Sequence, residues 1–423
     1  MVVTVWSGRE TLALRTALRM TIEAFAEHLG VAVRTVAKWE AQGPKIVPTP
    51  GIQDVLDAAL ERATPPQQSR FEMLLEESSA PGERVNRLDR REFINDVLAV
   101  VTLGMLHPDR LAAALGAPVA ADKRLLEDLG AMADEYGRMY WCMRPAALWP
   151  TVYGHATLTR CIHAGAPAAI RREAAALASQ SAALLGLLAH RLHKRTESAM
   201  YLSLAVELAV EAQNGSLHGH ALVALRSAYS PVTAIASADP QKALKLLDEA
   251  EDVAGPAAPP LLRTWLYASR AEDHAVLNHA EEAKRDLDVA ESALAQAPRH
   301  PGGFFDHWDA TRLAGFRGNC DVLLRKPEDA IVVLEAVARN TSPDLIGPYG
   351  AVRADLAAAY SQRDEVERAC ALLDDVLVTA HMARMPEQAA RVQRIRSVYL
   401  SHRADTAAVR QLDDHLSQFE IGA

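Results

Sequence analysis

The feature that most constrains the fold is an internal period of about 40 residues in the second half of the chain. An Ala-x-x-x-Leu pair recurs five times, and successive pairs start 40, 47, 39 and 39 residues apart. Each pair follows a turn signal such as Asp239-Pro240, and an apolar segment with helical periodicity ends just before that turn. The repeating unit is therefore helix-turn-helix-turn. The pairs are Ala243/Leu247, Ala283/Leu287, Ala330/Leu334, Ala369/Leu373 and Ala408/Leu412.

Helix pairs of this length cannot bury their apolar faces alone, so they must stack on one another. The period therefore predicts an α-solenoid, with a plain helical bundle as the alternative. Composition agrees, because hydrophobic residues make up 49% of the chain and aromatic residues only 5%, with Ala and Leu throughout. The one strand-like run is Val2–Trp6. We expect an all-α protein.

Two segments carry a more specific pattern. Trp265-x-Tyr267-Ala268 and Ala357-Ala358-Ala359-Tyr360 place aromatic and small residues on the first helix of their units. In this respect the chain resembles tetratricopeptide repeats over residues 196–418, and more weakly over 88–195. The resemblance implies a superhelical body with a concave groove.

The N-terminal segment predicts a different arrangement of short helices. Thr21 stands where a helix N-cap belongs, and Gly30 can end that helix in the left-handed conformation. A second helix is predicted over Ala32–Ala41, and Gly43-Pro44 stops it. The other helices predicted here are Ser7–Arg19, Gly51–Arg62 after an N-cap at Thr49, and Gln67–Glu77.

The spacing within these two helices is typical of a helix-turn-helix. Ala26 is small where the helices cross, Gly30 makes the turn, and Val36 and Trp39 share the face that packs inward. The side chains left facing outward are Val33, Arg34, Thr35 and Lys38. Such a face can meet base edges and phosphates, whereas a helical hairpin without a DNA role is the alternative.

Residues 21–31 and 34–40 resemble the XRE/Cro-like repressor family, including the ending Val-x-Lys-Trp-Glu. The resemblance implies that Val33, Arg34 and Lys38 read bases and that Thr21 and Thr35 touch phosphates. Many relatives have Gln or Ser in place of Val33, and a valine can contact only a thymine methyl group.

Charge is distributed unevenly along the chain. The net charge is −9, yet residues 1–50 sum to +2 and the remainder to −11. A basic head on an acidic body limits non-specific DNA binding to the head. We therefore expect a DNA-binding domain over residues 1–77, a linker over 78–87, and a tetratricopeptide-like body over 88–423.

Patterns typical of enzymes and metal sites are missing from the sequence. His190 and His193 lack an HExxH context, and Gly315-x-x-Gly318 is not a phosphate-binding loop. No nucleophile motif occurs either. We expect no enzyme activity, no cofactor and no metal.

The cellular compartment follows from the cysteines and the apolar runs. Four cysteines without a CxxC motif indicate reduced core thiols in a reducing compartment. Neither a secretory signal nor an apolar run of membrane length occurs, so we expect a cytoplasmic protein.

Two aromatic clusters in the body suggest a ligand site, because ligand grooves combine aromatic side chains with a few fixed polar groups. One cluster lies around Tyr140 and the other around Trp308, and inter-helix core is the alternative explanation for both. The candidate ligand-binding residues are Tyr140, Trp141, Arg144, Tyr153, Trp308, Arg312 and Asn319.

The whole arrangement resembles actinobacterial regulators with an XRE-like head and a tetratricopeptide-like body. Related bacterial regulators sense signalling peptides with such a body, which implies a sensor of a peptide or small molecule here. A single short helix-turn-helix reads few bases, so we expect a homodimer on a palindromic operator in double-stranded DNA. Two alternatives remain: an adaptor whose solenoid recruits a protein partner, and a scaffold whose head no longer binds DNA.

Overall fold

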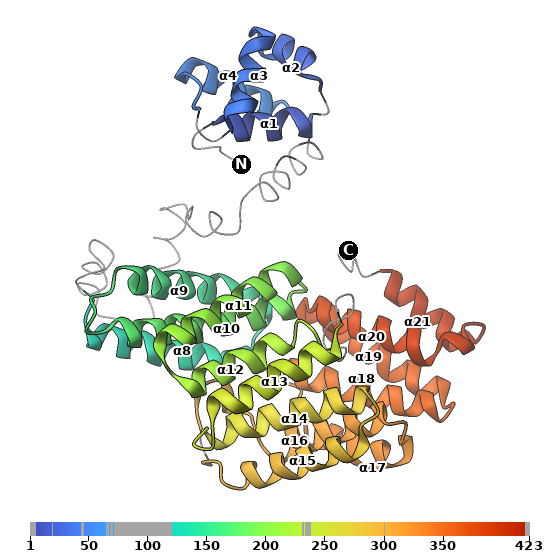
Figure 1. Ribbon diagram of the computed structural model, residues 1–423. Coiled ribbons are helices and arrows are strands. Elements are labelled where there is room, and N and C mark those ends of the chain that lie inside the picture. Colours follow the sequence, from blue (N-terminus) through green and yellow to red (C-terminus); the bar gives the residue numbers. More distant parts are fainter. Residues whose placement is uncertain are drawn as a thin grey trace. The chain divides into compact units, whose positions relative to one another are not determined.

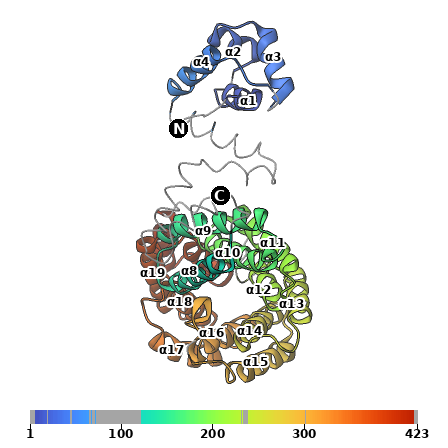
Figure 2. The same cartoon turned by 90° about the vertical axis from the view of Figure 1, so that its left-hand side faces the viewer.

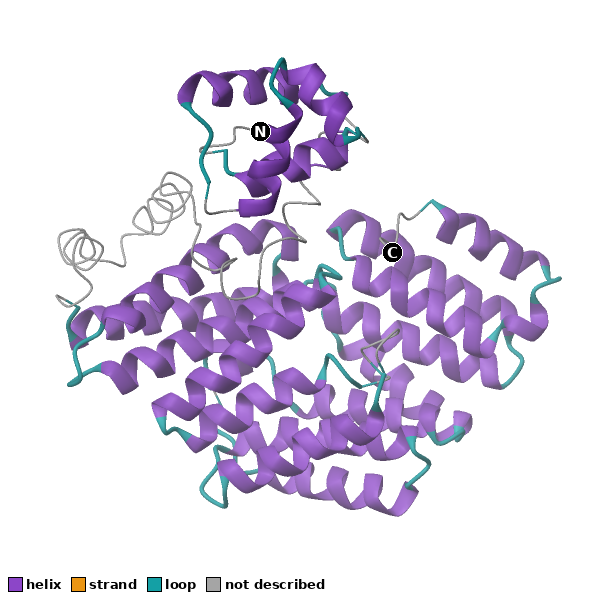
Figure 3. Cartoon of the chain, turned by 45° about the horizontal axis from the view of Figure 1, so that its top comes forward, coloured by secondary structure: helices purple, strands orange, loops and turns teal. Residues whose placement is uncertain are grey.

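The computed structural model describes residues 6–18, 20–43, 46–64, 67, 71, 121–230, 232, 238–299 and 301–418. These residues form helices joined by short turns, and none of them forms a strand (Figures 1 and 3). The expected all-α class is therefore confirmed for the described part of the chain. Two compact units divide the chain after Phe93. The expected linker and the start of the body at 88 lie outside the described residues.

The N-terminal unit has four helices among its described residues: α1 (Gly8–Ala17), α2 (Ile22–Leu29), α3 (Val33–Gln42) and α4 (Pro50–Glu61). Thr21 caps α2, because its hydroxyl accepts a hydrogen bond from the Ala24 amide at 3.2 Å. Gly30 ends α2 with φ +67°, which is the left-handed conformation expected for a C-terminal glycine. The Thr49 side chain makes no such bond, so proline at the first position sets the start of α4.

The core of this unit explains why the helices hold their spacing. Val36 and Trp39 of α3 are buried together with Phe25 and Ala26 of α2, as the helix-turn-helix spacing predicted. Trp6, noted in the sequence only as part of a strand-like run, is fully buried, stacks on Phe71 and donates a hydrogen bond to Asp57 at 2.8 Å.

A charged clamp joins α1 to α3. Arg15 pairs with both carboxylate oxygens of Glu40, at 2.6 and 3.0 Å, and also donates to the Met20 carbonyl. Both side chains are largely buried, so this bidentate pair stabilises the domain rather than serving as an exposed charge.

The body consists of helices in sequential pairs. The helices are α8 (Lys123–Cys142), α9 (Pro145–Gly165), α10 (Arg171–Arg191), α11 (Arg195–Ala212), α12 (Gly215–Arg226), α13 (Pro240–Ala254), α14 (Pro260–Val276), α15 (Ala280–Leu294), α16 (Ala310–Leu323), α17 (Pro327–Asn340), α18 (Ile346–Gln362), α19 (Val366–Ala383), α20 (Pro386–Tyr399) and α21 (Ala407–Ser417), with short 3-10 turns η3 (Gly303–Phe305) and η4 (Ser401–Arg403).

The pairs build two layers. From α10 to α19 each even-numbered helix packs on the odd-numbered helix that follows it, and from α8 to α20 each even-numbered helix also contacts the next even-numbered one. The recurrent Ala-x-x-x-Leu pairs lie on the odd-numbered helices α13 to α21. All of these side chains are buried except Ala408, which is half-buried. The 40-residue period thus reports the contact between the two helices of a pair.

The array curves until its ends meet. Helix α8 contacts α18 (Figure 2). Helix α10 also contacts α20. The turn η3 packs on α8 at Gly137, where an added Cβ atom would lie 2.6 Å from the Phe304 nitrogen. The body is therefore a closed curve of helices, with the even-numbered helices on its inner side.

Three further expectations concern membranes, metals and thiols. Within the described segments, no helix has the combination of length and apolar character that spanning a bilayer needs. The same segments hold no group of three or more His, Cys, Asp or Glu side chains arranged to bind a metal. All four cysteines are free. The expectation that all are core thiols is wrong for Cys142 and Cys161, which are exposed because they lie on outward faces of α8 and α9.

Candidate functional site

The N-terminal unit offers one polar helix face. On α3, Val36 and Trp39 are 0% and 5% exposed, whereas Val33 is 45% exposed and Arg34 and Lys38 are also exposed. Thr35 lies between these two faces and is half-buried. One side of α3 is thus fixed in the core while the other presents two cations.

These cations are free to meet an external anion. Neither Arg34 nor Lys38 forms an ion pair with a described residue, whereas Arg15 is fully engaged by Glu40. The N-cap of α3, Ala32, provides no side-chain hydrogen bond to the first amides of the helix. Thr21 is also exposed, and its hydroxyl oxygen accepts the hydrogen bond from the Ala24 amide of α2.

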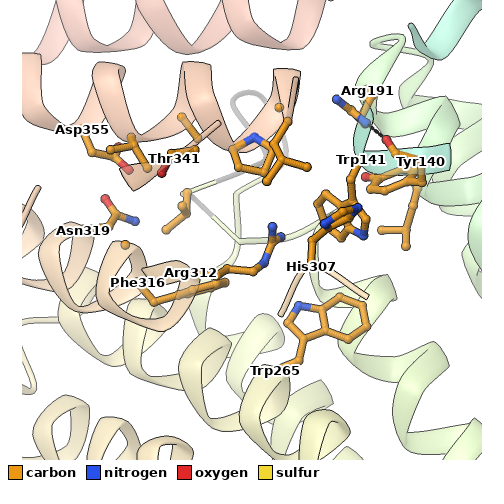
Figure 4. Close-up of a pocket in the computed structure, with 18 of the residues that line it drawn as sticks. Tyr140, Trp141, Arg191, Trp265, His307, Arg312, Phe316, Asn319, Thr341 and Asp355 are labelled. Atoms are coloured by element: carbon orange, nitrogen blue, oxygen red, sulfur yellow. Dashed lines mark hydrogen bonds between the residues drawn. The ribbon is translucent and has the colours of Figure 1, made fainter. Parts of the chain in front are cut away.

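The body holds a cavity of about 360 Å³ on its inner side. Its walls come from even-numbered helices α8 to α20, together with the segment around η3 and the end of α17 (Figure 4). Residues from α8 at the start of the body and from α20 near its end therefore line one space. This size falls within the range of small-molecule sites.

One wall of the cavity is aromatic. Phe304 of η3 lies between Trp141 of α8 and Trp265 of α14, with ring centroids 5.0 and 5.3 Å away. The Trp141 indole donates a hydrogen bond to the Phe304 carbonyl at 2.7 Å. Phe316 of α16 extends the same wall. Such apolar surface favours a ligand with a flat or aliphatic part.

Arg312 lies against this wall. Its Cζ atom is 3.9 Å from the Trp141 ring centroid and 4.6 Å from that of Trp308, a cation–π arrangement with two indoles. The Nε atom is buried and has no hydrogen-bond partner among the described residues. Burial lowers the pKa of Arg312 to about 10, so the guanidinium still carries its charge at neutral pH.

A buried ion-pair network meets the cavity through Arg226, Glu272 and Asn319. Arg226 donates to Asp273 at 2.7 Å and to Glu272 at 3.0 Å. The Asn319 amide donates to Glu272 at 2.7 Å, and the Ser230 hydroxyl donates to Asp273 at 2.5 Å. Because these donors and acceptors satisfy one another, the network fixes the positions of α12, α14 and α16.

A second pair lies closer to the C-terminal end. Arg391 of α20 binds Asp355 of α18, and both side chains are largely buried. Two buried atoms here have no hydrogen-bond partner among the described residues. They are the side-chain oxygen of Gln388 and the Nε atom of Arg391. This part of the wall keeps polar atoms available to a ligand.

The structure brings together four of the seven residues expected at a ligand site. Tyr140 and Trp141 from the first aromatic cluster line the same cavity as Arg312 and Asn319 from the second. Trp308 does not line the cavity, but its ring contacts those of Trp265 and Phe316 and lies beneath the Arg312 guanidinium.

The remaining two residues lie away from the cavity. Arg144 is exposed before α9, and Tyr153 stacks on Trp149 with ring centroids 6.0 Å apart. Neither side chain is among those that line the cavity.

Several cavity residues were missed in the sequence. Arg226 ends an apolar run of α12, and Arg191 does the same on α10. A single arginine at the end of a buried Ala/Leu run is a signal of a buried cation, because the run places it in the core. Charged residues are rarely buried there without a partner. The partners Glu272 and Asp355 gave no comparable signal.

Comparison with protein-family models gave no match, and comparison with curated proteins gave none either.

Proposed function

We propose that the protein is a sequence-specific DNA-binding transcription regulator, with an XRE/Cro-like head and a tetratricopeptide-like body that dimerises and senses a ligand. The observation that carries the proposal is the two-sided α3, with Val36 and Trp39 buried and Arg34 and Lys38 exposed without ion pairs among the described residues. A helix held this way can enter the major groove and meet base edges and phosphates.

The cavity supports the sensing part of the proposal. It is lined by helices from α8 to α20 and has an aromatic wall beside polar groups without partners among the described residues. A ligand that binds one state of the body better than another shifts the population toward that state. In a homodimer the shift changes the spacing of the two heads and hence affinity for a two-fold operator.

Selection of bound DNA from a random pool tests the head. The wild-type chain should enrich a palindrome whose half-sites lie about 34–36 Å apart, or a multiple of that distance. Arg34→Ala/Lys38→Ala should abolish the enrichment and lower the salt dependence of binding. Arg62→Ala, an exposed cation at the end of α4, is the matched control and should select the same sequence. No enrichment by the wild-type chain at moderate salt, with or without cell extract, contradicts the proposal.

A further inference from the structure

The cavity contains four arginines, and only two of them have acidic partners. Arg226 pairs with Glu272 and Asp273, and Arg391 pairs with Asp355. The other two, Arg191 and Arg312, line the cavity and form no ion pair with any described residue. An unpaired cation in such a place costs free energy unless an anion joins it.

The bonds of Arg191 show how far the protein satisfies that cation. It donates to the Tyr140 carbonyl and to the Met385 sulfur at 3.5 Å, and it lies on the Tyr140 ring. Glu387 is half-buried on α20 and lines the cavity, but it is not within ion-pair distance of Arg191. Arg191 is therefore held in place mainly by neutral acceptors.

Arg312 is less satisfied. No side-chain hydrogen bond runs from its guanidinium to a described residue, and only the two indole faces contact it closely. The nearest aspartates along the chain, Asp306 and Asp309, are exposed. Asp309 is also engaged as the N-cap of α16, where it accepts from the Arg312 backbone amide at 2.9 Å. The guanidinium edge is thus left for a ligand, as Figure 4 illustrates.

We propose that the cavity binds a small arylalkyl carboxylic acid, with its carboxylate on Arg312 and its ring against Trp265 and Phe316. The inference deepens the proposed function, on which it rests, by naming the class of ligand. A carboxylate matches the planar guanidinium of Arg312 and carries a single charge, whereas Arg191 is already held by the Tyr140 carbonyl and ring. A dianionic phosphate fits less well, because Glu272, Asp355 and Glu387 also line the cavity.

Size supports the same class of ligand. A cavity of about 360 Å³ lies near the lower end of the range for small-molecule sites, which matches a compact acid with one aromatic group. The aromatic wall provides the contact area that a phenyl or indole group buries. Thr341 and Gln388 also line the cavity, and their polar groups can form hydrogen bonds with a polar substituent of the ligand.

Calorimetric titration of the full chain with named probes tests the inference. The probes are phenylacetate, 3-phenylpropanoate, 4-phenylbutanoate and indole-3-propanoate, each beside its neutral amide and phenyl phosphate. We expect at least one acid to bind with a Kd below about 1 mM, and its amide and phenyl phosphate to bind at least about tenfold more weakly. If no acid binds, or if the amide or phenyl phosphate equals its acid, the inference is wrong.

Two arginine variants test whether the carboxylate of the ligand binds to Arg312. Arg312→Met keeps the length of the side chain between the indoles and should weaken acid binding about tenfold to a hundredfold without affecting the amide. Arg317→Met removes a half-buried arginine of the same helix, which pairs with Glu291 and does not line the cavity, and should leave affinity unchanged. Equal loss in both variants, or no loss in Arg312→Met, contradicts the assignment. The comparison of acid with amide on the wild-type chain stands even where a variant does not fold.

The DNA selection separates the two proposals. Acid binding without any enriched DNA sequence supports the ligand class and overturns the proposed regulator. An enriched palindrome without binding of any acid supports the regulator and overturns the ligand class.

Discussion

Removing the cation from the buried network should strongly destabilise the body. Arg226 is 5% exposed, and its partners Glu272 and Asp273 are 6% and 0% exposed. Arg226→Met leaves two buried carboxylates with only the Asn319 amide and the Ser230 hydroxyl as donors. Breaking a buried pair in this way costs about 3–5 kcal/mol, because the remaining charge is uncompensated.

The matched control removes every charge of the network. Arg226→Met/Glu272→Gln/Asp273→Asn leaves no uncompensated ion, so it should recover most of the lost stability. A surface control, Arg285→Met, breaks the exposed pair with Glu282 and should cost less than about 0.5 kcal/mol. Equilibrium urea unfolding, followed by circular dichroism and tryptophan fluorescence, measures all three.

The pH dependence gives an independent check of the same argument. Burial raises the pKa of Glu272 above its usual value, although Arg226 and the Asn319 amide oppose the shift. Without Arg226 the folded state should take up protons more readily than the unfolded state as pH falls from 7 to 5. The deficit of Arg226→Met should therefore shrink at pH 5. A deficit below about 1 kcal/mol at pH 7, or a triple variant no more stable than the single one, refutes the reasoning.

Three further predictions concern particular side chains, each measured by urea unfolding. Gly30→Ala should lower the free energy of unfolding by about 1–2 kcal/mol, because Gly30 has φ +67°. The control Gly51→Ala, at a position with open space around it, should be neutral or stabilising. Equal losses in the two variants contradict this prediction. Gly137→Ala should cost about 1–3 kcal/mol because its Cβ atom meets the η3 backbone, and Gly130→Ala on the same helix is the control that should cost nothing. Burial lowers the pKa of His155 to about 4, so protonation of this side chain should lower stability by about 3 kcal/mol between pH 6.5 and 4. His155→Leu should reduce the acid loss by that amount and leave the loss due to His220, whose pKa burial also lowers to about 4. An unchanged pH profile would count against this.

Local structure was predictable because its causes are local. Thr21 as N-cap, Gly30 in the left-handed region and the inward pair Val36 and Trp39 each follow from helix geometry within a few residues. The period of about 40 residues marked the second helices of the pairs, because a small residue and a leucine one turn later must meet the preceding helix. These patterns predicted an all-α chain.

The cavity could not be predicted to the same extent. Trp141 and Phe304 are 163 residues apart, and they meet because the curved array brings η3 onto α8. The sequence placed their two clusters separately and gave no reason to join them. Curvature results from small rotations between successive helix pairs, which no short pattern records. Arg144 and Tyr153 were grouped with the site because they are near Trp141 in sequence, yet their side chains are not among those that line the cavity.

Closure of the array determines what a ligand can do. Arg312 of α16 and Trp141 of α8 come from distant parts of the body, and a molecule bound between them contacts both. Helix α8 is held there by its contacts with η3 and α18. A ligand of this cavity therefore favours the closed array by the difference between its affinities for the closed and the opened forms. Any effect on DNA binding must come through that difference, so an acid that binds Arg312 tightly but equally well in both forms leaves operator affinity unchanged.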